Sequence, residues 1–324
     1  MPVRSNAQVD IVVPLYNEAD VFEQTYRDLC GVINKLPQRF SILCVDDGST
    51  DATSAMLQKL AGRDKRISVL PLSRNFGHQA ALTAGLAAAK GSIVISMDGD
   101  GQHPPQLIPE MLRLLQEGFD IVQGQRADSV QGGAFKRWTS GGFYQVLNSI
   151  SGTHVIPGAA DFRAMSRQAV DALNSMPEYH RFLRGMISWM GFSSVILPYT
   201  EPKRVAGRSK YSLGKMIRLA MDAMFSFSLA PLYVGLSLGG ILLCLAAAEM
   251  AYVLSFWVTG RTSGLAPGWS SLMFVVLIVG GMLMVLLGFV GVYVGYIFQE
   301  VKHRPVFLRR KGAAGKARTS RARS

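Results

Sequence analysis

Two long stretches without a charged residue constrain this chain most. Leu229–Ala248 has no charge in 20 positions, and Leu272–Phe298 has none in 27. At 1.5 Å per residue, each stretch is long enough to cross a hydrocarbon layer of about 30 Å as a helix. We therefore predict two transmembrane helices, 229–257 and 272–298, joined by a short external loop, 258–271.

The excess positive charge lies beside these stretches. The formal net charge is +12, yet residues 1–202 carry 18 Lys and Arg against 19 Asp and Glu. Residues 203–218 add six basic residues and residues 302–324 add nine, with no acidic residue in either segment. By the positive-inside rule, both flanks lie in the cytoplasm. We therefore expect no nucleic-acid partner and predict that 299–324 is a solvated basic tail.

Short apolar runs alternate with segments of helical length before the first uncharged stretch. The runs are typical of buried strands: Val9–Pro14, Phe40–Val45, Ile67–Leu72, Ser92–Met97 and Phe119–Gln123. The segments between them are Ala19–Leu36, Asp51–Ala61, Gly77–Lys90 and Pro104–Glu117. This alternation predicts a mostly parallel sheet with helices on both faces, within a domain of residues 1–202. In such sheets the ligand binds at the carboxyl ends of the strands.

Carboxylates follow two of the predicted strands. Asp98 and Asp100 come directly after one apolar run, and Mg²⁺ prefers one or two carboxylates together with substrate phosphates. An EF-hand loop is excluded because His103 occupies its sixth position, where glycine is needed. A plain acidic turn would explain this pair if it stood alone, but a second pair, Asp46 and Asp47, follows a neighbouring strand. Together they predict a metal and ligand site.

The second pair is expected to contact a ligand directly. Asp46 and Asp47 can accept hydrogen bonds from a base or ribose, and Gly48 lets the backbone approach closely. Ser49 or Thr50 is expected to cap the helix that follows. The chain has neither a P-loop nor a G-x-G-x-x-G after the first strand, and no G-x-S-x-G elbow. Its three cysteines are scattered, which predicts neither a zinc site nor disulfides.

A basic segment precedes the first predicted span. Arg204, Arg208 and Lys210 stand just before Ser212–Phe227, an amphipathic stretch predicted to lie in the membrane interface within 203–228. Guanidinium and ammonium groups at that depth suit a lipid phosphate. General attraction to anionic lipids is the alternative.

Seven sequence motifs, in order between residues 8 and 300, resemble the polyprenyl-phosphate glycosyltransferases of family 2. This subgroup includes dolichol-phosphate mannose synthase and the bactoprenol glucosyltransferases. The motifs are IVVPLYNE (11–18), VDDGSTD (45–51), NFGHQAAL (75–82), SMDGDGQHPP (96–105), DFRAMSR (161–167), FLRGMISWMGF (182–192) and RVAGRSKYS (204–212). The resemblance implies a GT-A fold and inverting transfer of a hexose, most simply glucose from UDP-glucose, to undecaprenyl or another polyprenyl phosphate. The product would be a lipid-linked sugar for cell-envelope glycan modification.

The resemblance also implies roles for individual residues and partners. Asp98 and Asp100 would hold Mg²⁺ or Mn²⁺, and Asp161, with Asp100, would be catalytic. The nucleotide sugar would meet Pro14, Tyr16, Glu18, Asp46, Asp47, Asp98, Gln102, His103 and Arg126. The lipid phosphate would meet Arg204, Arg208 and Lys210. A homo-oligomer such as a tetramer, a separate flippase and a multi-pass location in the bacterial inner membrane, with the catalytic domain in the cytoplasm, are also implied.

Two other functions compete with this interpretation. A processive polysaccharide synthase shares the early motifs but carries Q-x-x-R-W, whereas Arg137-Trp138 here has Ala134 at the upstream position. A non-catalytic membrane scaffold or lipid-binding subunit leaves both carboxylate pairs unexplained. Transfer of a labelled sugar into extractable lipid, with and without EDTA, separates the three.

Overall fold

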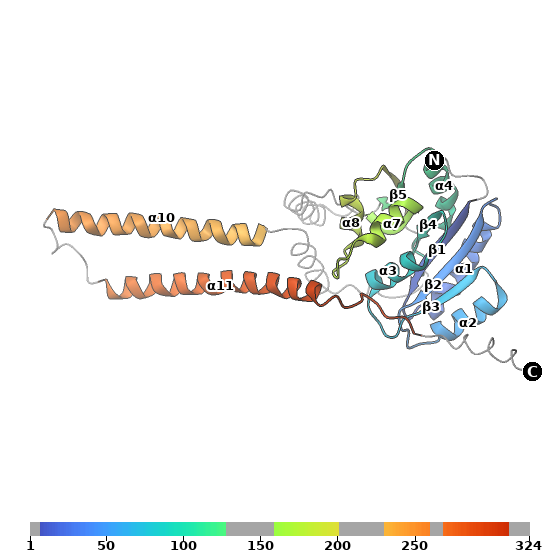
Figure 1. The fold of residues 1–324 in the computed structure, drawn as a ribbon, viewed down its shortest axis with the longest axis horizontal. Coiled ribbons are helices and arrows are strands. Elements are labelled where there is room, and N and C mark those ends of the chain that lie inside the picture. The colour runs from blue at the N-terminus through green and yellow to red at the C-terminus, as the bar shows by residue number, and fades with distance from the viewer. Residues whose placement is uncertain (1–6, 128–158, 201–229, 260–267, 311–324) are drawn as a thin grey trace, which may run out of the picture. The chain divides into compact units, whose positions relative to one another are not determined.

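The structure is a computed structural model that describes residues 7–127, 159–200, 230–259 and 268–310 (Figure 1). The chain divides into two units. The first is Met1–Leu213 together with Pro305–Ser324, and the second is Gly214–Arg304. The predicted interfacial stretch and the three basic residues before it lie outside the described residues.

Within the described residues, seven strands form one sheet in the order β3-β2-β1-β4-β6-β5-β7. The strands are β1 (Gln8–Leu15), β2 (Arg39–Asp46), β3 (Ile67–Pro71), β4 (Ile93–Ser96), β5 (Ile121–Arg126), β6 (Ala159–Ser166) and β7 (Ser194–Tyr199). All neighbours are parallel except β6, which is antiparallel to both β4 and β5. The prediction of a mostly parallel sheet is confirmed, and the five predicted strands match β1 to β5.

Two strands were not predicted. β6 carries Asp161 and Arg163, which interrupt its apolar run, although both side chains are buried in the structure. β7 lies at the edge of the sheet, where every second residue from Ser194 to Pro198 is exposed. A half-exposed edge strand of six residues containing a proline has the composition of a loop.

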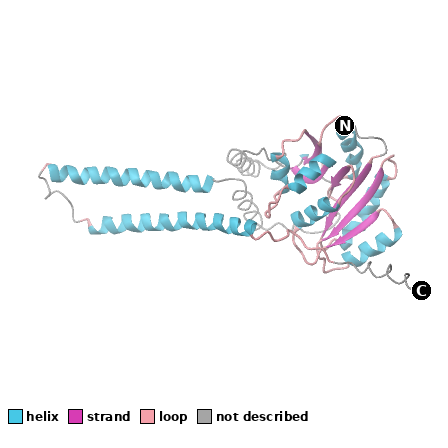
Figure 2. Ribbon diagram, in the orientation of Figure 1, coloured by secondary structure: helices cyan, strands magenta, loops and turns pink. Residues whose placement is uncertain are grey.

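Helices cover both faces of the sheet, as Figure 2 shows. They are α1 (Ala19–Ile33), α2 (Thr53–Arg63), α3 (His78–Ala88), the 3₁₀ turn η1 (Pro105–Leu107), α4 (Ile108–Gln116), α7 (Arg167–Ser175) and α8 (Leu183–Trp189). Alternate β1 residues such as Ile11 and Val13 pack in one core with Phe22 of α1. On the other face, Gly85 of α3 sits so close to Val12 that a Cβ would collide with it. Alternation along β1 therefore builds both layers.

The second unit contains α10 (Ala230–Val258) and α11 (Trp269–Val301), which contact each other. α10 contains all of the first uncharged stretch except Leu229 and continues through Glu249, and α11 contains all of the second. Gly235 of α10 lies against Leu286 of α11, where a Cβ would collide with the leucine side chain. Among the described residues, one helical stretch, Ile278–Val301, is long and apolar enough to cross a membrane.

The residues after α11 differ from the predicted solvated tail. Pro305–Arg310 returns to the first unit, where Arg309 pairs antiparallel with Leu72, next to β3. The Ser73 N–H donates to the Leu308 carbonyl oxygen, and the Arg310 N–H donates to the Pro71 carbonyl oxygen, both at 2.8 Å. This part of 299–324 is therefore not a free tail, because β3 is an edge strand whose backbone groups need partners.

Candidate active site

The antiparallel strand β6 brings distant residues to the edge where β1, β2 and β4 end. Arg163 pairs with Ser96, the last residue of β4, so the first residues of β6 lie beyond that end. The Ser96 hydroxyl donates to the Asp161 carbonyl oxygen at 2.7 Å. Asp98 follows β4 by two residues. Asp98 and Asp161 are consequently neighbours at one sheet edge.

Asp98 lies between two histidines. His78 Nε2 is 3.4 Å from Asp98 Oδ1, and His103 Nε2 is 3.6 Å from Asp98 Oδ2. The Asp98 N–H donates to His103 Nδ1 at 2.8 Å, which assigns the imidazole hydrogen to Nε2, facing the carboxylate. His103 is fully buried and stacks on Phe162, and burial lowers its pKa, so it is neutral. His103 therefore contacts Asp98 from inside the domain, and its contact with the donor stays a prediction.

Asp161 is surrounded by cations and an amide. Oδ1 accepts from Arg163 at 2.7 Å and from Arg184 at 3.3 Å, while Oδ2 accepts from Arg184 at 3.1 Å and from Gln79 at 3.4 Å. His78 Nε2 is 3.3 Å from Oδ2. Burial raises the pKa of Asp161, but Arg184, His78 and Arg163 lower it by more, to well below its usual range. Asp161 is therefore ionised and its oxygens are occupied.

Arg163 holds Asp161 from within the sheet. Its side chain is 1% exposed, and Nη2 also donates to the Ala160 carbonyl oxygen at 3.1 Å. Burial lowers the pKa of this guanidinium. Within the described part of the chain, Arg163 Nε and Nη1 have no hydrogen-bond partner. A buried cation of this kind is tolerated only beside an anion, so Asp161 and Arg163 depend on each other.

His78 joins the two carboxylates. It is the first residue of α3, and its side chain is 42% exposed, so it lines the open side of the site. Burial lowers the pKa of His78, but Asp98 and Asp161 raise it by more, to about 9. The imidazole is thus a cation at neutral pH and offsets the repulsion between Asp98 and Asp161.

Asp47 holds the loop that leads into α3. Its carboxylate oxygens accept the N–H groups of Phe76 at 2.8 Å and Gly77 at 2.9 Å. Gly48 has φ +67°, and a Cβ there would collide with the Arg74 backbone. Burial raises the pKa of Asp47, an effect that the two N–H donors oppose. Both oxygens are engaged in fixing this loop, and donor contact by Asp47 stays a prediction.

Asn17 ties together the loops after β1 and β2. Its N–H donates to Ser49 Oγ at 3.2 Å, and its Oδ1 accepts from the Thr50 N–H at 2.9 Å. The prediction that Ser49 or Thr50 caps the next helix is wrong, because α2 begins at Thr53. Instead, Asp51 Oδ1 accepts the Thr53 N–H at 2.9 Å.

The remaining predicted residues are placed as follows. Asp46 ends β2 and accepts the Ser49 N–H at 2.9 Å, and Asp100 Oδ1 accepts the Gln102 N–H at 3.0 Å. Gln102 is buried. The other donor-site candidates lie at strand ends: Pro14 in β1, Tyr16 and Glu18 after it, and Arg126 at the end of β5. Arg204, Arg208 and Lys210 lie outside the described residues, so their role stays a prediction.

Four residues of this arrangement were not among the predicted site residues: His78, Gln79, Arg163 and Arg184. All four stand inside the motifs NFGHQAAL, DFRAMSR and FLRGMISWMGF. An arginine and an aspartate inside an otherwise apolar run were the usable signal, because charges are buried only when they are paired.

Comparison with known proteins settles the family. The family model described as glycosyl transferase family 2 matches residues 10–173, half of the chain. The chain belongs to glycosyl transferase family 2. An uncharacterised glycosyltransferase of Synechocystis is 37% identical over 93% of this chain and 94% of its own length. The SfII prophage-derived bactoprenol glucosyl transferase of Shigella flexneri is 34% identical over 95% of this chain and 99% of its own.

The fold of this family 2 glycosyltransferase also matches a solved structure. The mannosyl-3-phosphoglycerate synthase of Rubrobacter xylanophilus aligns with a TM-score of 0.50 and 17% identity, over 81% of this chain and 78% of that one. At that identity the match concerns the fold alone. The predicted GT-A fold and the prediction that the chain is a transferase are confirmed.

The site of this glycosyltransferase fits a divalent cation that the substrate helps to bind. Asp98 Oδ1 is buried and accepts no hydrogen bond from the described residues. Those residues contain no cluster of three or more His, Cys, Asp or Glu side chains suited to a metal. Asp98 and Asp100 offer oxygen ligands, which suit Mg²⁺ or Mn²⁺ when donor phosphates complete the shell.

Proposed function

We propose that this glycosyltransferase moves glucose from UDP-glucose to a polyprenyl phosphate, undecaprenyl phosphate in a bacterium, with inversion at the sugar carbon. The observation that carries the proposal is the similarity to a bactoprenol glucosyl transferase over 99% of that protein. Because the match covers 95% of this chain, it takes in most of both long helices as well as the sheet. A catalytic domain alone would not account for that extent.

The chemistry of the acceptor suits the surroundings of Asp161. A phosphate monoester has a second pKa near 6, so at neutral pH it is largely a dianion and already a nucleophile. An acceptor oxygen forms a bond to the sugar carbon as the bond from that carbon to the diphosphate breaks. Asp161, whose oxygens are occupied, holds Arg184 and His78 in place. These two cations would then bring the anionic substrates together.

The departing diphosphate needs positive charge. A divalent cation held by Asp98 and Asp100 would supply it when bound, as a Lewis acid on the phosphate oxygens. His103 would keep Asp98 oriented for that task, because its Nδ1 accepts the Asp98 N–H. Arg126 at the end of β5 is proposed as a further partner of the diphosphate.

The two long helices support a proposal for the placement in the membrane. We propose that α10 and α11 both cross the bacterial inner membrane and that the sheet domain lies in the cytoplasm. The support is the uncharged stretches within both helices and the basic segments that flank them. Arg204, Arg208 and Lys210 would then meet the lipid phosphate at the interface. A homo-oligomer and a separate flippase stay predictions.

One assay tests the proposal. Membranes containing the protein, supplied with undecaprenyl phosphate and labelled UDP-glucose, should transfer label into solvent-extractable lipid, and EDTA should abolish the transfer. A panel of UDP-N-acetylglucosamine, GDP-mannose and UDP-aminoarabinose tests the choice of sugar. Label in a long insoluble polymer would support the processive synthase, and activity with another donor would overturn the assignment of glucose.

A further inference from the structure

The segment Pro305–Arg310, here named the C-terminal strap, extends the sheet at its β3 edge. Two backbone hydrogen bonds of 2.8 Å join it to the chain just after β3, from Ser73 N–H to Leu308 O and from Arg310 N–H to Pro71 O. Between these bonds lies the antiparallel bridge of Leu72 and Arg309. Both bonds are made by main-chain atoms, so they define a pairing that does not require particular strap side chains.

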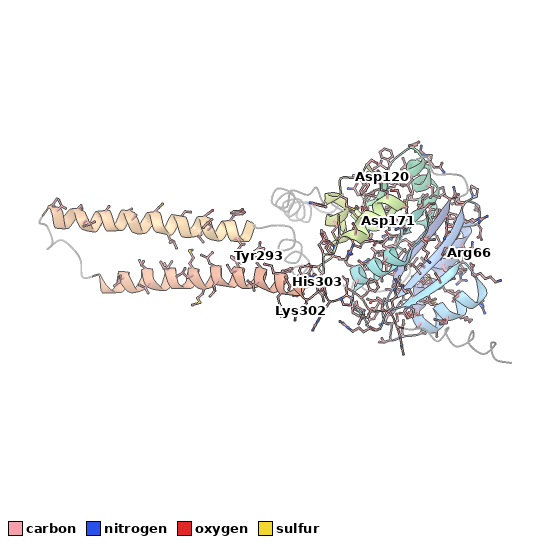
Figure 3. All side chains as sticks on the ribbon, in the orientation of Figure 1. Arg66, Asp120, Asp171, Tyr293, Lys302 and His303 are labelled. Carbon is pink, nitrogen blue, oxygen red and sulfur yellow. The ribbon has the colours of Figure 1, made fainter. Side chains whose placement is uncertain are left out.

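The strap follows α11 after only three residues. Lys302 and His303, labelled in Figure 3, and Arg304 stand between Val301, the end of the helix, and Pro305. His303 has φ +47°, a left-handed conformation that turns the chain. Three residues span about 10 Å at most. The strap is therefore tied by a short connection to the long apolar helix.

Within the sheet domain the strap contacts the start of the loop of residues 73–77. We name it the donor loop because Asp47, a predicted donor contact, accepts its N–H groups. Ser73 begins this loop, and Asp47 fixes its far end through the N–H groups of Phe76 and Gly77. His78, directly after the loop, contacts Asp98 and Asp161. The donor loop is thus held at one end by Asp47, and at the other by the strap together with the hydrogen bond from the Leu72 N–H to the Asp46 carbonyl oxygen.

We propose that the C-terminal strap is a positioning element of the active site, which fixes the donor loop and thereby sets the affinity for the nucleotide sugar. Asp47 alone holds only the end next to α3. Pro71 pairs with Asp46 of β2, and the Leu72 N–H donates to the Asp46 carbonyl oxygen at 2.8 Å, so the part of the chain that depends on the strap begins at Ser73. Without the strap, Ser73 would regain freedom at the edge of the sheet, and binding of the donor would have to order the loop again. The effect on donor affinity rests on the proposed function, whereas the effect on the loop does not.

A pair of variants at one position isolates the backbone contact. Arg310→Pro removes the N–H that donates to Pro71, whereas Arg310→Ala removes the same charge and keeps that N–H. The full chain in detergent is compared by hydrogen exchange of peptides covering residues 71–77. Arg310→Pro should exchange at least about fivefold faster there, and Arg310→Ala should match the wild type.

Kinetics on the same proteins test the consequence for the site. In Arg310→Pro, the KM for UDP-glucose should rise about three- to tenfold, with kcat and the KM for undecaprenyl phosphate nearly unchanged. Truncation after Arg310 removes the basic residues beyond the strap and should leave exchange and KM unchanged, whereas truncation after Arg304 should reproduce the effect of Arg310→Pro.

Three results would overturn the proposal. Unchanged exchange in both Arg310→Pro and the truncation after Arg304 would show that the strap does not fix the loop. Equal effects of Arg310→Pro and Arg310→Ala would assign the effect to the side chain. Faster exchange with an unchanged donor KM would separate the loop from donor binding. Absence of glucosyl transfer in the wild type would instead refute the proposed function and leave the exchange result to stand.

Discussion

Asp98 and Asp161 lie at the same sheet edge and share His78 as a neighbour, but their surroundings differ. Asp98 has a side chain that is 23% exposed, and its Oδ1 accepts no hydrogen bond from the described residues. Asp161 is 5% exposed, and Arg163, Arg184 and Gln79 donate to its two oxygens. Asp98 Oδ1 thus faces the His78 ring at 3.4 Å without a hydrogen bond, whereas hydrogen-bond donors engage both oxygens of Asp161.

This difference shows how carboxylates at one sheet edge can serve two purposes. A carboxylate with an available oxygen can bind a cation or a donor group, whereas a carboxylate saturated by cations keeps those cations in position. Strand direction explains this division, because Asp98 lies two residues after the end of β4 and Asp161 lies near the start of β6, which is antiparallel to β4. The predictions below test whether the two carboxylates behave as differently as their contacts.

Asp98→Asn should produce the largest loss. Removing the charge of this half-buried carboxylate, the proposed metal ligand, should lower kcat/KM for glucosyl transfer about 1,000-fold while the thermal unfolding midpoint stays near that of the wild type. Asp171→Asn is the matched control, because Asp171, labelled in Figure 3, is exposed and pairs with Arg167 on α7. Turnover near that of the wild type with the same Mg²⁺ dependence would remove Asp98 from the metal site.

Unlike Asp98→Asn, Asp161→Asn should lower both kcat and the free energy of unfolding. It removes the charge that the buried Arg163 pairs with, so we expect a loss of roughly 3 kcal/mol in the free energy of unfolding. In folded protein, kcat should fall about 100-fold while the KM for UDP-glucose changes less than about threefold. A large loss of donor affinity with normal turnover would make Asp161 a donor ligand instead.

His103→Phe should weaken metal binding at Asp98 and leave the contacts of Asp161 unchanged. Phenylalanine can keep the stacking on Phe162 but removes the Nδ1 acceptor of the Asp98 N–H. We expect about tenfold more Mg²⁺ to be needed for half-maximal transfer, because outer contacts orient metal ligands. An unchanged Mg²⁺ requirement would show that His103 does not orient Asp98.

The smallest expected effect is a change with pH in the stability difference between the wild type and Asp161→Asn. The pKa of Asp161 in the folded protein is well below its unfolded value of about 3.9, so its contribution to stability is present above that value and is lost as pH falls toward the folded pKa. The stability gap between wild type and Asp161→Asn should therefore narrow from pH 5 to pH 3. A gap that stayed constant from pH 5 to pH 3 would show that folding does not lower the pKa of Asp161.

The carboxylates around Asp98 could be predicted from the sequence, whereas the cations around Asp161 could not. Asp46, Asp98 and Asp100 follow apolar parallel strands, so their meeting at one edge follows from topology rules. The cations around Asp161 come from β6, α3 and α8, and β6 was not recognised as a strand because its own charges interrupt it. The strap was missed since its pairing with Leu72 depends on a contact across most of the chain.

Binding of Mn²⁺ in the presence of UDP, followed by electron paramagnetic resonance on the wild type, Asp98→Asn and Asp161→Asn, tests the central comparison most directly. The dissociation constant should rise at least about tenfold in Asp98→Asn and stay within about threefold of the wild type in Asp161→Asn. Equal weakening in both variants, or retention of Mn²⁺ affinity by Asp98→Asn, would contradict the division of tasks between the two carboxylates.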